Sequence, residues 1–414
     1  MLRLVQHYIQ KYVLPYVPWY ERTGARSKKE IDGILQCVHQ LFPCVEDHEM
    51  VDLSNWLRHI WDNHYPYASL SISNTDTEID NIRNRLQYMK HVKQYPQRSP
   101  EWYQHRKTMI TASEFGKLQM KPKICEQIYQ RKQNPVTKQL TNAAILWGVM
   151  FEPVATMLYE RIHNVTLGEY GLIPHASPHV RVGASPDALV ETESSGKYGF
   201  LVEIKCPYSR TINGLPSETY WEQMQMQLEC CNLDYCDFWE VSFRMEWEGY
   251  EIAPHTENWL EKNYNIILSR HTEQKAQIPY VGVVIECEKD NKKEYFYSSL
   301  YHIEELQQRN TYESIVAWKS SVVDKVIAQD DLVYITTKYW SVNTSSLITV
   351  PRNKHWFYQI ALPRINYYWT YVEQNASKQN SNANDMISHV MQPQKKQTLV
   401  IGSFCAIEDS DEES

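Results

Sequence analysis

Long apolar runs are missing from this sequence of 414 residues, and so is an N-terminal export signal. No segment approaches the roughly 18 consecutive apolar residues that a helix needs to cross a membrane. The first stretch, Met1 to Lys11, has no apolar core of the kind that defines a secretory signal peptide. We therefore expect a soluble, intracellular protein that has no membrane partner.

A disulfide framework is missing as well. The nine cysteines are an odd number, scattered over a long chain without the spacing of a disulfide-rich scaffold. That pattern fits a reducing compartment, in which thiols stay free. The group Cys230, Cys231 and Cys236 leaves a metal knuckle open, although no second cysteine or histidine pair accompanies it at ligand spacing. We interpret the cysteines mainly as free thiols.

An excess of positive charge is missing from the whole chain, whose formal net charge is −8. The charge is unevenly distributed, because the segment from Arg106 to Lys138 holds eight basic residues and only two acidic ones. The eight are Arg106, Lys107, Lys117, Lys121, Lys123, Arg131, Lys132 and Lys138. Such a segment predicts a polyanion-binding face, with a solvated basic face as the alternative. The acidic end, Glu408 to Ser414, is either a solubilising segment or a partner-binding one.

Periodicity and composition divide the chain into four predicted parts. Apolar residues at helical spacing predict a helical N-terminal module over 1–95, and the proline-bracketed stretch Tyr95–Pro100 ends it. A core follows over 96–300. Segment 301–373 is predicted to be a helical, aromatic-rich accessory segment, and 374–414 is too poor in apolar residues to fold and is predicted to be disordered. The accessory tryptophans are core residues or base-stacking residues, and they are Trp340, Trp356 and Trp369.

The predicted core mixes helices with strands. Segments rich in β-branched and aromatic residues predict strands, and these are Val180–Val182, Ala188–Glu191, Phe200–Cys206, Asp237–Phe243 and Tyr280–Cys287. Apolar helical patterns precede and follow the first of them. The fold class that this order indicates is mixed α/β.

The segment Phe200–Cys206 carries a pair of charged residues on one face of its strand. Side chains alternate across a strand, so Glu203 and Lys205 point the same way. Asp187 begins the preceding strand, and hairpin pairing would place its carboxylate beside Glu203. Two carboxylates with a backbone carbonyl suit Mg²⁺, and a neighbouring lysine suits phosphodiester hydrolysis. The alternative for the Glu203 and Lys205 pair alone is the polar face of an exposed strand.

Two helices supply further candidates. Glu152 lies on the same predicted helical stripe as the apolar residues Ile145, Val149, Ala155 and Tyr159. A carboxylate buried there would need a metal or a basic partner, whereas one at the edge of the stripe would simply reach solvent. In the later helix, Tyr220, Gln223 and Gln227 form a stripe, from which Gln223 could point at a nucleophile or remain an ordinary exposed amide.

Five motifs in order resemble one known family. They are EWYQHRKTMITASEFG from Glu101, WGVMFEPVA from Trp147, GASPDALV from Gly183, VEIKCP from Val202 and YWEQMQMQ from Tyr220. Together, over about 97–245, they are similar to the lambda-exonuclease-like (YqaJ-type) viral recombinases of the PD-(D/E)XK nuclease superfamily. The resemblance implies a restriction-endonuclease-like core, a central mixed sheet flanked by helices.

The resemblance also implies roles for individual residues. The implied metal ligands are Asp187, Glu203, the Ile204 carbonyl and Glu152. Lys205 corresponds to the catalytic lysine and Gln223 to the family's helix glutamine, so the catalytic set becomes Asp187, Glu203, Lys205 and Gln223. The implied phosphate and DNA contacts are Trp102, Arg106, Thr111, Ser113 and Tyr220.

The function that the resemblance implies is Mg²⁺-dependent 5′→3′ degradation of duplex DNA to mononucleotides, with Mn²⁺ as a substitute metal. The implied partners are double-stranded DNA ends, a single-strand annealing or ssDNA-binding protein, and further copies of the chain. The extra segments resemble homologues from large DNA viruses of eukaryotes, which implies action in viral recombination, replication or repair, in the host cytoplasm or nucleus. Ala188 departs from the glycine that commonly follows the family's SPD.

Two other functions remain open from the residues alone. The same fold could serve a metal-dependent endonuclease that acts on DNA or RNA. A non-catalytic DNA-binding recombination scaffold is the alternative from a different class, and the presence of every catalytic residue type argues against it.

Overall fold

The structure is a computed structural model that describes residues 75–96, 99–134, 142–249, 278–329 and 331–389, with short pieces at 35–36, 50–51, 53, 265 and 267–269. Most of the predicted N-terminal module, the basic residue Lys138 and the acidic end lie outside the described residues. No helix in the described part is both long enough and apolar enough to cross a membrane.

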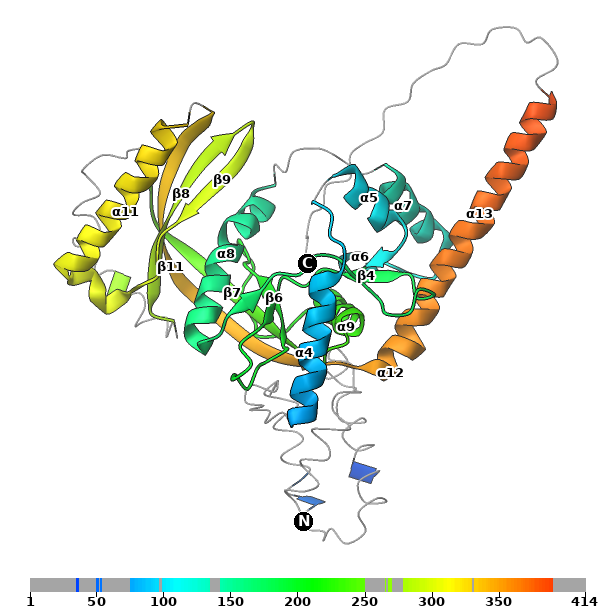
Figure 1. Cartoon of the computed structure of the whole chain (residues 1–414), viewed down its shortest axis with the longest axis horizontal. Helices are drawn as coiled ribbons and strands as arrows, with labels where there is room; N and C mark the ends of the chain where they lie inside the picture. The colour runs from blue at the N-terminus through cyan, green and yellow to red at the C-terminus, as the bar shows by residue number, and fades with distance from the viewer. Residues whose placement is uncertain are drawn as a thin grey trace.

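A mixed sheet forms the centre of the described structure, with strand order β10-β8-β11-β7-β6-β5-β2 and β9 paired to β8 (Figure 1). Its strands are β2 (Leu167–Gly168), β5 (Ala188–Val190), β6 (Leu201–Lys205), β7 (Tyr235–Gly249), β8 (Tyr280–Lys289), β9 (Lys292–Tyr297), β10 (Tyr301–His302) and β11 (Leu332–Pro351). Strands β6 and β7 run parallel, and the other pairs are antiparallel. A small second sheet has the order β1-β4-β3. It contains β1 (Ile110–Thr111), β3 (Ile173–Pro174) and β4 (Val182–Ala184).

Helices cover both faces of the central sheet. They are α4 (Asp76–His91), α5 (Pro100–Lys107), α6 (Ala112–Phe115), α7 (Pro122–Gln133), α8 (Ala143–His163), α9 (Glu218–Cys231), α11 (Arg309–Ile327), α12 (Lys354–Trp356) and α13 (Leu362–His389). On one face α8 buries Phe151 and Leu158 against Ile204. On the other face α9 buries Met224 together with Leu201. A central mixed sheet flanked by helices confirms the predicted fold class.

Local sequence explains the ends of the two helices that flank the site. Asn142 begins α8 by accepting a hydrogen bond from the Ala144 N–H at 2.8 Å, and Ser217 caps α9 in the same way. Each helix ends at an asparagine, Asn164 or Asn232, with a φ of 51°. Asparagine tolerates this left-handed conformation better than most residues, so both stops are encoded locally.

The C-terminal segment differs from its prediction. The predicted helical segment 301–373 does contain α11 and the start of α13, but Leu332–Pro351 is a 20-residue strand. The prediction of helix is wrong there, because the segment pairs with β8 over Leu332–Ser341 and with β7 over Thr337–Pro351, and its many β-branched residues favour a strand. Its central Trp340 is buried, as are Trp356 and Trp369, which confirms them as core residues.

Helix α13 also departs from the predicted tail. The predicted tail, from residue 374, begins inside α13, which continues to His389. The helix is started by a packed segment that includes Ile365 and Tyr368, and propagation from a formed turn is easier than nucleation. Residues 390–414 lie outside the described part of the chain.

Segments on both sides of the predicted domain boundaries share one core. From α4, Leu86 and Met89 join the cluster that also contains α9. Arg85 donates hydrogen bonds to the carbonyls of Cys230 and Cys231 at the end of α9. Strand β11, which lies beyond the predicted boundary at 300/301, pairs with β7 of the predicted core. The limits at 95/96 and 300/301 therefore do not separate packing units within the described structure.

A buried carboxylate ties these elements together. Asp237 on β7 is fully buried and accepts three hydrogen bonds of 2.6 Å, from Tyr159 of α8, from Lys197 and from Thr349 of β11. A buried carboxylate is tolerated only when it is paired and hydrogen-bonded. Burial and the Asp237 charge raise the pKa of Tyr159, so its hydroxyl remains a donor.

We predict that Tyr159→Phe lowers the free energy of unfolding by about 1.5–3 kcal/mol, because a buried hydrogen bond to a charged group is lost. Urea unfolding followed by circular dichroism measures this loss. Tyr371→Phe is the matched control, because its hydroxyl donates to Glu126 at 2.8 Å near the surface, and its effect should be much smaller. Equal losses in the two variants would contradict the role given to Asp237.

Candidate active site

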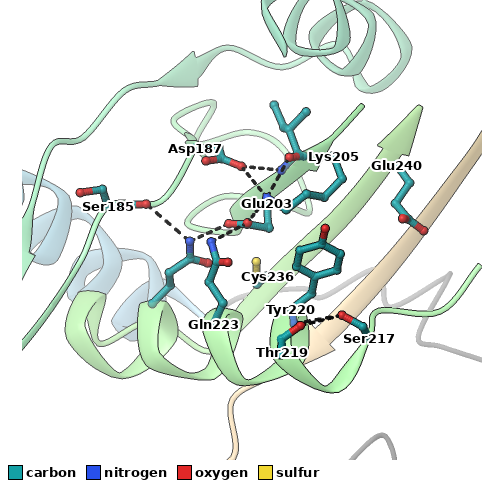
Figure 2. A network of polar contacts seen from close by, with 12 residues as sticks. Ser185, Asp187, Glu203, Lys205, Ser217, Thr219, Tyr220, Gln223, Cys236 and Glu240 are labelled. Carbon is teal, nitrogen blue, oxygen red and sulfur yellow. Dashed lines mark hydrogen bonds and ion pairs between the residues drawn. The ribbon is translucent and has the colours of Figure 1, made fainter. Parts of the chain in front are cut away.

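Hairpin pairing brings the two predicted carboxylates together. Strands β5 and β6 are antiparallel, with Ala188 opposite Val202, so Asp187 lies beside Glu203 (Figure 2). The Ile204 N–H donates to Asp187 Oδ2 at 2.8 Å and fixes that carboxylate at the end of the strand. The juxtaposition that the alternating pattern predicted is therefore present in the structure.

Glu203 is fully buried, and both of its oxygens are bonded. Gln223 donates to Oε1 and Gln227 to Oε2, each at 2.6 Å, and Lys205 also donates to Oε1. The two glutamines are one turn apart on α9, so a single helix face holds a single carboxylate. Gln227, which also approaches the Ser185 carbonyl at 3.5 Å, was not among the predicted site residues. Its place on the Gln223 stripe was the signal that could have identified it.

The Lys205 ammonium lies among three oxygens. It contacts Glu203 Oε1, the Ile204 carbonyl at 3.1 Å and Asp187 Oδ2 at 3.8 Å. The Tyr220 ring lies on another side, 5.3 Å from the nitrogen. The carboxylates raise the pKa of Lys205, so the group is a cation. These three oxygens, the predicted metal ligands apart from Glu152, therefore converge on a position that accepts positive charge.

One positive charge does not neutralise this site. Burial raises the pKa of Asp187 to about 8, and the charges of Glu203 and Glu152 act in the same direction against Lys205. At neutral pH without a further cation, Asp187 is therefore mainly protonated. An added cation beside it would displace that proton, since it stabilises the ionised carboxylate.

Glu152 is placed differently from its prediction. The predicted buried stripe is wrong at its first half, because Ile145 and Val149 are exposed and Glu152 is exposed with them. The buried face of α8 instead centres on residues such as Phe151 and Leu158. Although the Glu152 side chain reaches solvent, neighbouring protein removes part of the water around its carboxyl group, and this desolvation raises its pKa. The charge of Glu203 also raises the pKa and that of Lys205 opposes it, so the carboxyl group lies near the site.

A complete side-chain metal site is not formed by the described residues, where no three His, Cys, Asp or Glu side chains converge as one ligand group. The ligand role of Glu152 therefore stays a prediction. The cysteine cluster is equally uninvolved, because Cys230, Cys231 and Cys236 are buried free thiols. The oxygen set around Lys205 has the chemistry that hard divalent cations prefer, with two carboxylates and a carbonyl.

A second polar cluster gathers the predicted phosphate-binding residues. Arg106 of α5 donates to Thr111 Oγ1 at 3.3 Å, and the hydroxyls of Thr111 and Ser113 are 3.5 Å apart. The guanidinium stacks over Trp102, 4.4 Å from the ring centre. Burial lowers the pKa of Arg106, although an arginine stays charged.

Strand pairing connects this cluster with the carboxylates. Thr111 on β1 pairs in parallel with Gly183 on β4, two residues before Ser185. Helix α6 also ends close to α9. The approach is so close at Gly116, which follows α6, that a Cβ added there would be 3.1 Å from the Thr219 side chain of α9. The phosphate cluster and the Glu203 centre are therefore built on adjoining elements. Tyr220 belongs to the Glu203 centre rather than to the Arg106 cluster.

The predicted basic face is only partly a surface. Lys132 is buried and bonds to Glu114 and to two backbone carbonyls, so its inclusion in a solvated or DNA-binding face is wrong. Helical periodicity puts Lys132 on the same buried face of α7 as Cys125 and Ile128, where it contacts residues of α5 and α6. The exposed members are Lys117, Lys121, Lys123 and Arg131.

A further buried carboxylate next to Lys205 was missed. Glu240 on β7 is the register partner of Lys205 on β6 and is fully buried. Its Oε1 accepts from Arg210 at 2.5 Å, whereas its Oε2 has no hydrogen-bond partner within the described structure. The segment DFWEVSF gave no sign of this role, because only the pairing of β6 with β7 brings Glu240 beside the lysine.

Comparisons with known proteins agree with the motifs. Residues 101–234 match the model of a family described as the YqaJ-like viral recombinase domain. Uncharacterized protein R354 of Acanthamoeba polyphaga mimivirus is 28% identical over 310 residues, which cover 70% of this chain and 54% of the mimivirus protein. The chain thus spans about half the length of this curated relative.

Two solved structures also align with the chain. They are the alkaline exonuclease LHK-Exo of Laribacter hongkongensis and its complex with dAMP, both at 22% identity and a TM-score of 0.30. The alignments cover 56% of this chain and 97% and 95% of those chains. At this TM-score the likeness carries no argument about fold or activity.

The matched segment contains the parts of the candidate site that the motifs predicted. It begins at Glu101 in α5, includes Asp187 and the strand that carries Glu203 and Lys205, and ends after α9. Residues 101–234, which carry the candidate site, are therefore similar to the YqaJ-like viral recombinase domain.

Proposed function

We propose that the chain is a Mg²⁺-dependent 5′→3′ exonuclease that degrades duplex DNA to mononucleotides, on a core of the PD-(D/E)XK type. The observation that carries this proposal is the Lys205 ammonium held by Glu203, the Ile204 carbonyl and Asp187. A cation already stands where three hard oxygen donors meet. The match of residues 101–234 to the YqaJ-like viral recombinase domain supports a nuclease that acts in recombination.

The proposed metal ligands are Asp187, Glu203 and the Ile204 carbonyl, with Glu152 as an added carboxylate nearby. Mg²⁺ suits this set because it prefers carboxylate and carbonyl oxygens, and Mn²⁺ would substitute. When bound, the metal would neutralise charge on the scissile phosphate and acidify a water. Gln223 and Gln227, one turn apart on α9, would keep Glu203 in place by their two hydrogen bonds.

Lys205 has two proposed tasks. In the present arrangement it compensates part of the charge of the carboxylates, so it must move off Glu203 when a divalent cation takes their oxygens. Its flexible stem then lets the ammonium orient the attacking water or hold the phosphate. The uncompensated oxygen of buried Glu240, its neighbour on β7, offers the displaced ammonium an alternative partner.

The Arg106 cluster would select the DNA end. A guanidinium beside hydroxyls suits a terminal phosphate, because such contacts are charge-assisted and directional. We propose that Arg106 and Ser113 contact the 5′-phosphate, with Thr111 and Trp102 positioning the guanidinium. Tyr220 would contact DNA beside the Glu203 centre.

The partners that follow are double-stranded DNA ends, a single-strand annealing or ssDNA-binding protein, and further copies of the chain. We place the action in viral recombination, replication or repair, in the host cytoplasm or nucleus. The match to a domain described as a viral recombinase supports the role in recombination.

We predict that linear duplex DNA loses mononucleotides from its 5′ ends in Mg²⁺, with Mn²⁺ as a weaker or equal substitute and no loss in EDTA. Duplexes labelled at either end, with or without a 5′-phosphate, measure the polarity and the product size. Asp187→Asn is the inactive control. Internal cuts would replace the proposal with an endonuclease, and DNA binding without any metal-dependent cleavage would replace it with a scaffold.

We predict opposite effects of Lys205→Met on chemistry and metal binding. Hydrolysis should fall by about a hundredfold or more, because a positioned proton-transfer or charge-stabilising group is lost. Metal affinity, measured by calorimetry, should rise because the competing ammonium is gone. The exposed Lys121→Met should change neither value appreciably. Unchanged hydrolysis in the Lys205 variant would remove that lysine from the mechanism.

We predict that metal affinity rises with pH up to about 8 and then levels, because the pKa of Asp187 is raised to about 8 and a ligand must lose its proton. Metal affinity rises with pH because, below the pKa of Asp187, the metal must displace a proton from that carboxyl group in order to bind. Calorimetry in buffers of different ionisation enthalpy measures both the affinity and the released proton. Asp187→Asn should weaken binding and flatten its dependence on pH, whereas a flat wild-type profile from pH 6 to 9 would contradict the prediction.

A further inference from the structure

A buried lysine on α7 lies directly behind the Arg106 cluster. Lys132 is 8% exposed, and its ammonium donates to Glu114 Oε2 at 2.7 Å, to the Met109 carbonyl at 2.9 Å and to the Arg106 carbonyl at 3.1 Å. An ammonium has three donors, and here all three have an acceptor. Lys132 is therefore unavailable to DNA, in contrast to its predicted place in the basic face.

The acceptor carboxylate sits inside the proposed phosphate cluster. The same Oε2 atom of Glu114 accepts from the Thr111 N–H at 2.9 Å and from the Thr111 hydroxyl at 2.7 Å. Because that hydroxyl donates to Glu114, it is free to accept from Arg106, which lies 3.3 Å away. Glu114 thus orients Thr111 and, through it, the guanidinium.

A carboxylate is nevertheless an unfavourable neighbour for a phosphate. Arg106 and Lys132 contribute two positive charges and Glu114 one negative charge, which leaves one net positive charge. Without Lys132 the sum would be zero, and Glu114 would compete with phosphate for Arg106. In the described structure no carboxylate forms an ion pair with Arg106, because Glu114 is engaged by Lys132. The same lysine helps to lower the pKa of Glu114 and keep it ionised.

We propose that Lys132 is a positioning residue that sets the preference for phosphorylated DNA ends, by neutralising Glu114 so that Arg106 stays available to the 5′-phosphate. This inference rests on the proposed function, which assigns the Arg106 cluster to that phosphate. Lys132 itself touches no DNA. Its effect passes through Glu114 and Thr111 to the guanidinium.

The test measures the affinity for one blunt duplex with a 5′-phosphate and with a 5′-hydroxyl, in EDTA to prevent cleavage. In wild type the phosphorylated duplex should bind more tightly. Lys132→Met should lower that ratio by about tenfold, the size of one lost charge-assisted contact. The exposed Lys123→Met has the same change in net charge and should weaken both duplexes equally, leaving the ratio unchanged.

Second variants separate this role from simple destabilisation. Lys132→Met leaves the half-buried Glu114 carboxylate without its ion-pair partner, which should lower the thermal midpoint. In the double variant Lys132→Met with Glu114→Gln, no uncompensated charge remains, so the end preference should return to within about threefold of wild type. Glu114→Gln alone adds one net positive charge and should keep or raise the ratio. That last variant keeps the test decisive if Lys132→Met does not fold.

The outcomes distinguish the two proposals. A wild type without preference for phosphorylated ends would overturn end selection in the proposed function and this inference with it. A wild-type preference that survives in folded Lys132→Met would overturn only the role of Lys132. A ratio that falls in Glu114→Gln, or stays low in the folded double variant, would also overturn it.

Discussion

The full burial of the Glu203 carboxylate is the constraint on which the rest of the site depends. A carboxylate that leaves water needs compensation for both oxygens, and here it comes from Lys205, Gln223 and Gln227. Two of these donors, Gln223 and Gln227, lie on α9, so the rotation of α9 about its own axis is fixed by the need to turn both side chains toward Glu203 on β6. The same packing brings the Ser185 loop close to α9 and leaves Asp187 at the open end of the strand.

The pairing of a carboxylate of low exposure with a lysine occurs twice in the candidate site. Lys205 neutralises Glu203 within the carboxylate centre, and Lys132 neutralises Glu114 behind the Arg106 cluster. In each case a lysine paired with one carboxylate leaves a neighbouring group available to a ligand: the Asp187 carboxylate to a cation, and the Arg106 guanidinium to an anion. The β1–β4 pairing and the contact of α6 with α9 hold the two centres together.

Strand β11 shows how far the site relies on residues distant in the chain. It pairs with β7 and β8 at once, and β7 in turn supports β6. Thr349 reaches across from β11 to the buried Asp237, which also holds α8. Buried and exposed residues do not alternate regularly along β11, so the period of two that marks a half-buried strand is absent from Leu332–Pro351.

Sequence alone determined the features that depend on neighbours along the chain. Alternation predicted that Glu203 and Lys205 share a face, the hairpin predicted Asp187 beside them, and one helical turn related Gln223 to Gln227. Tertiary structure alone decided which charges are buried and with whom. It put Lys132 inside, exposed Glu152 and set Glu240 beside Lys205, because burial and pairing depend on how helices and strands from distant segments pack, which local periodicity does not encode.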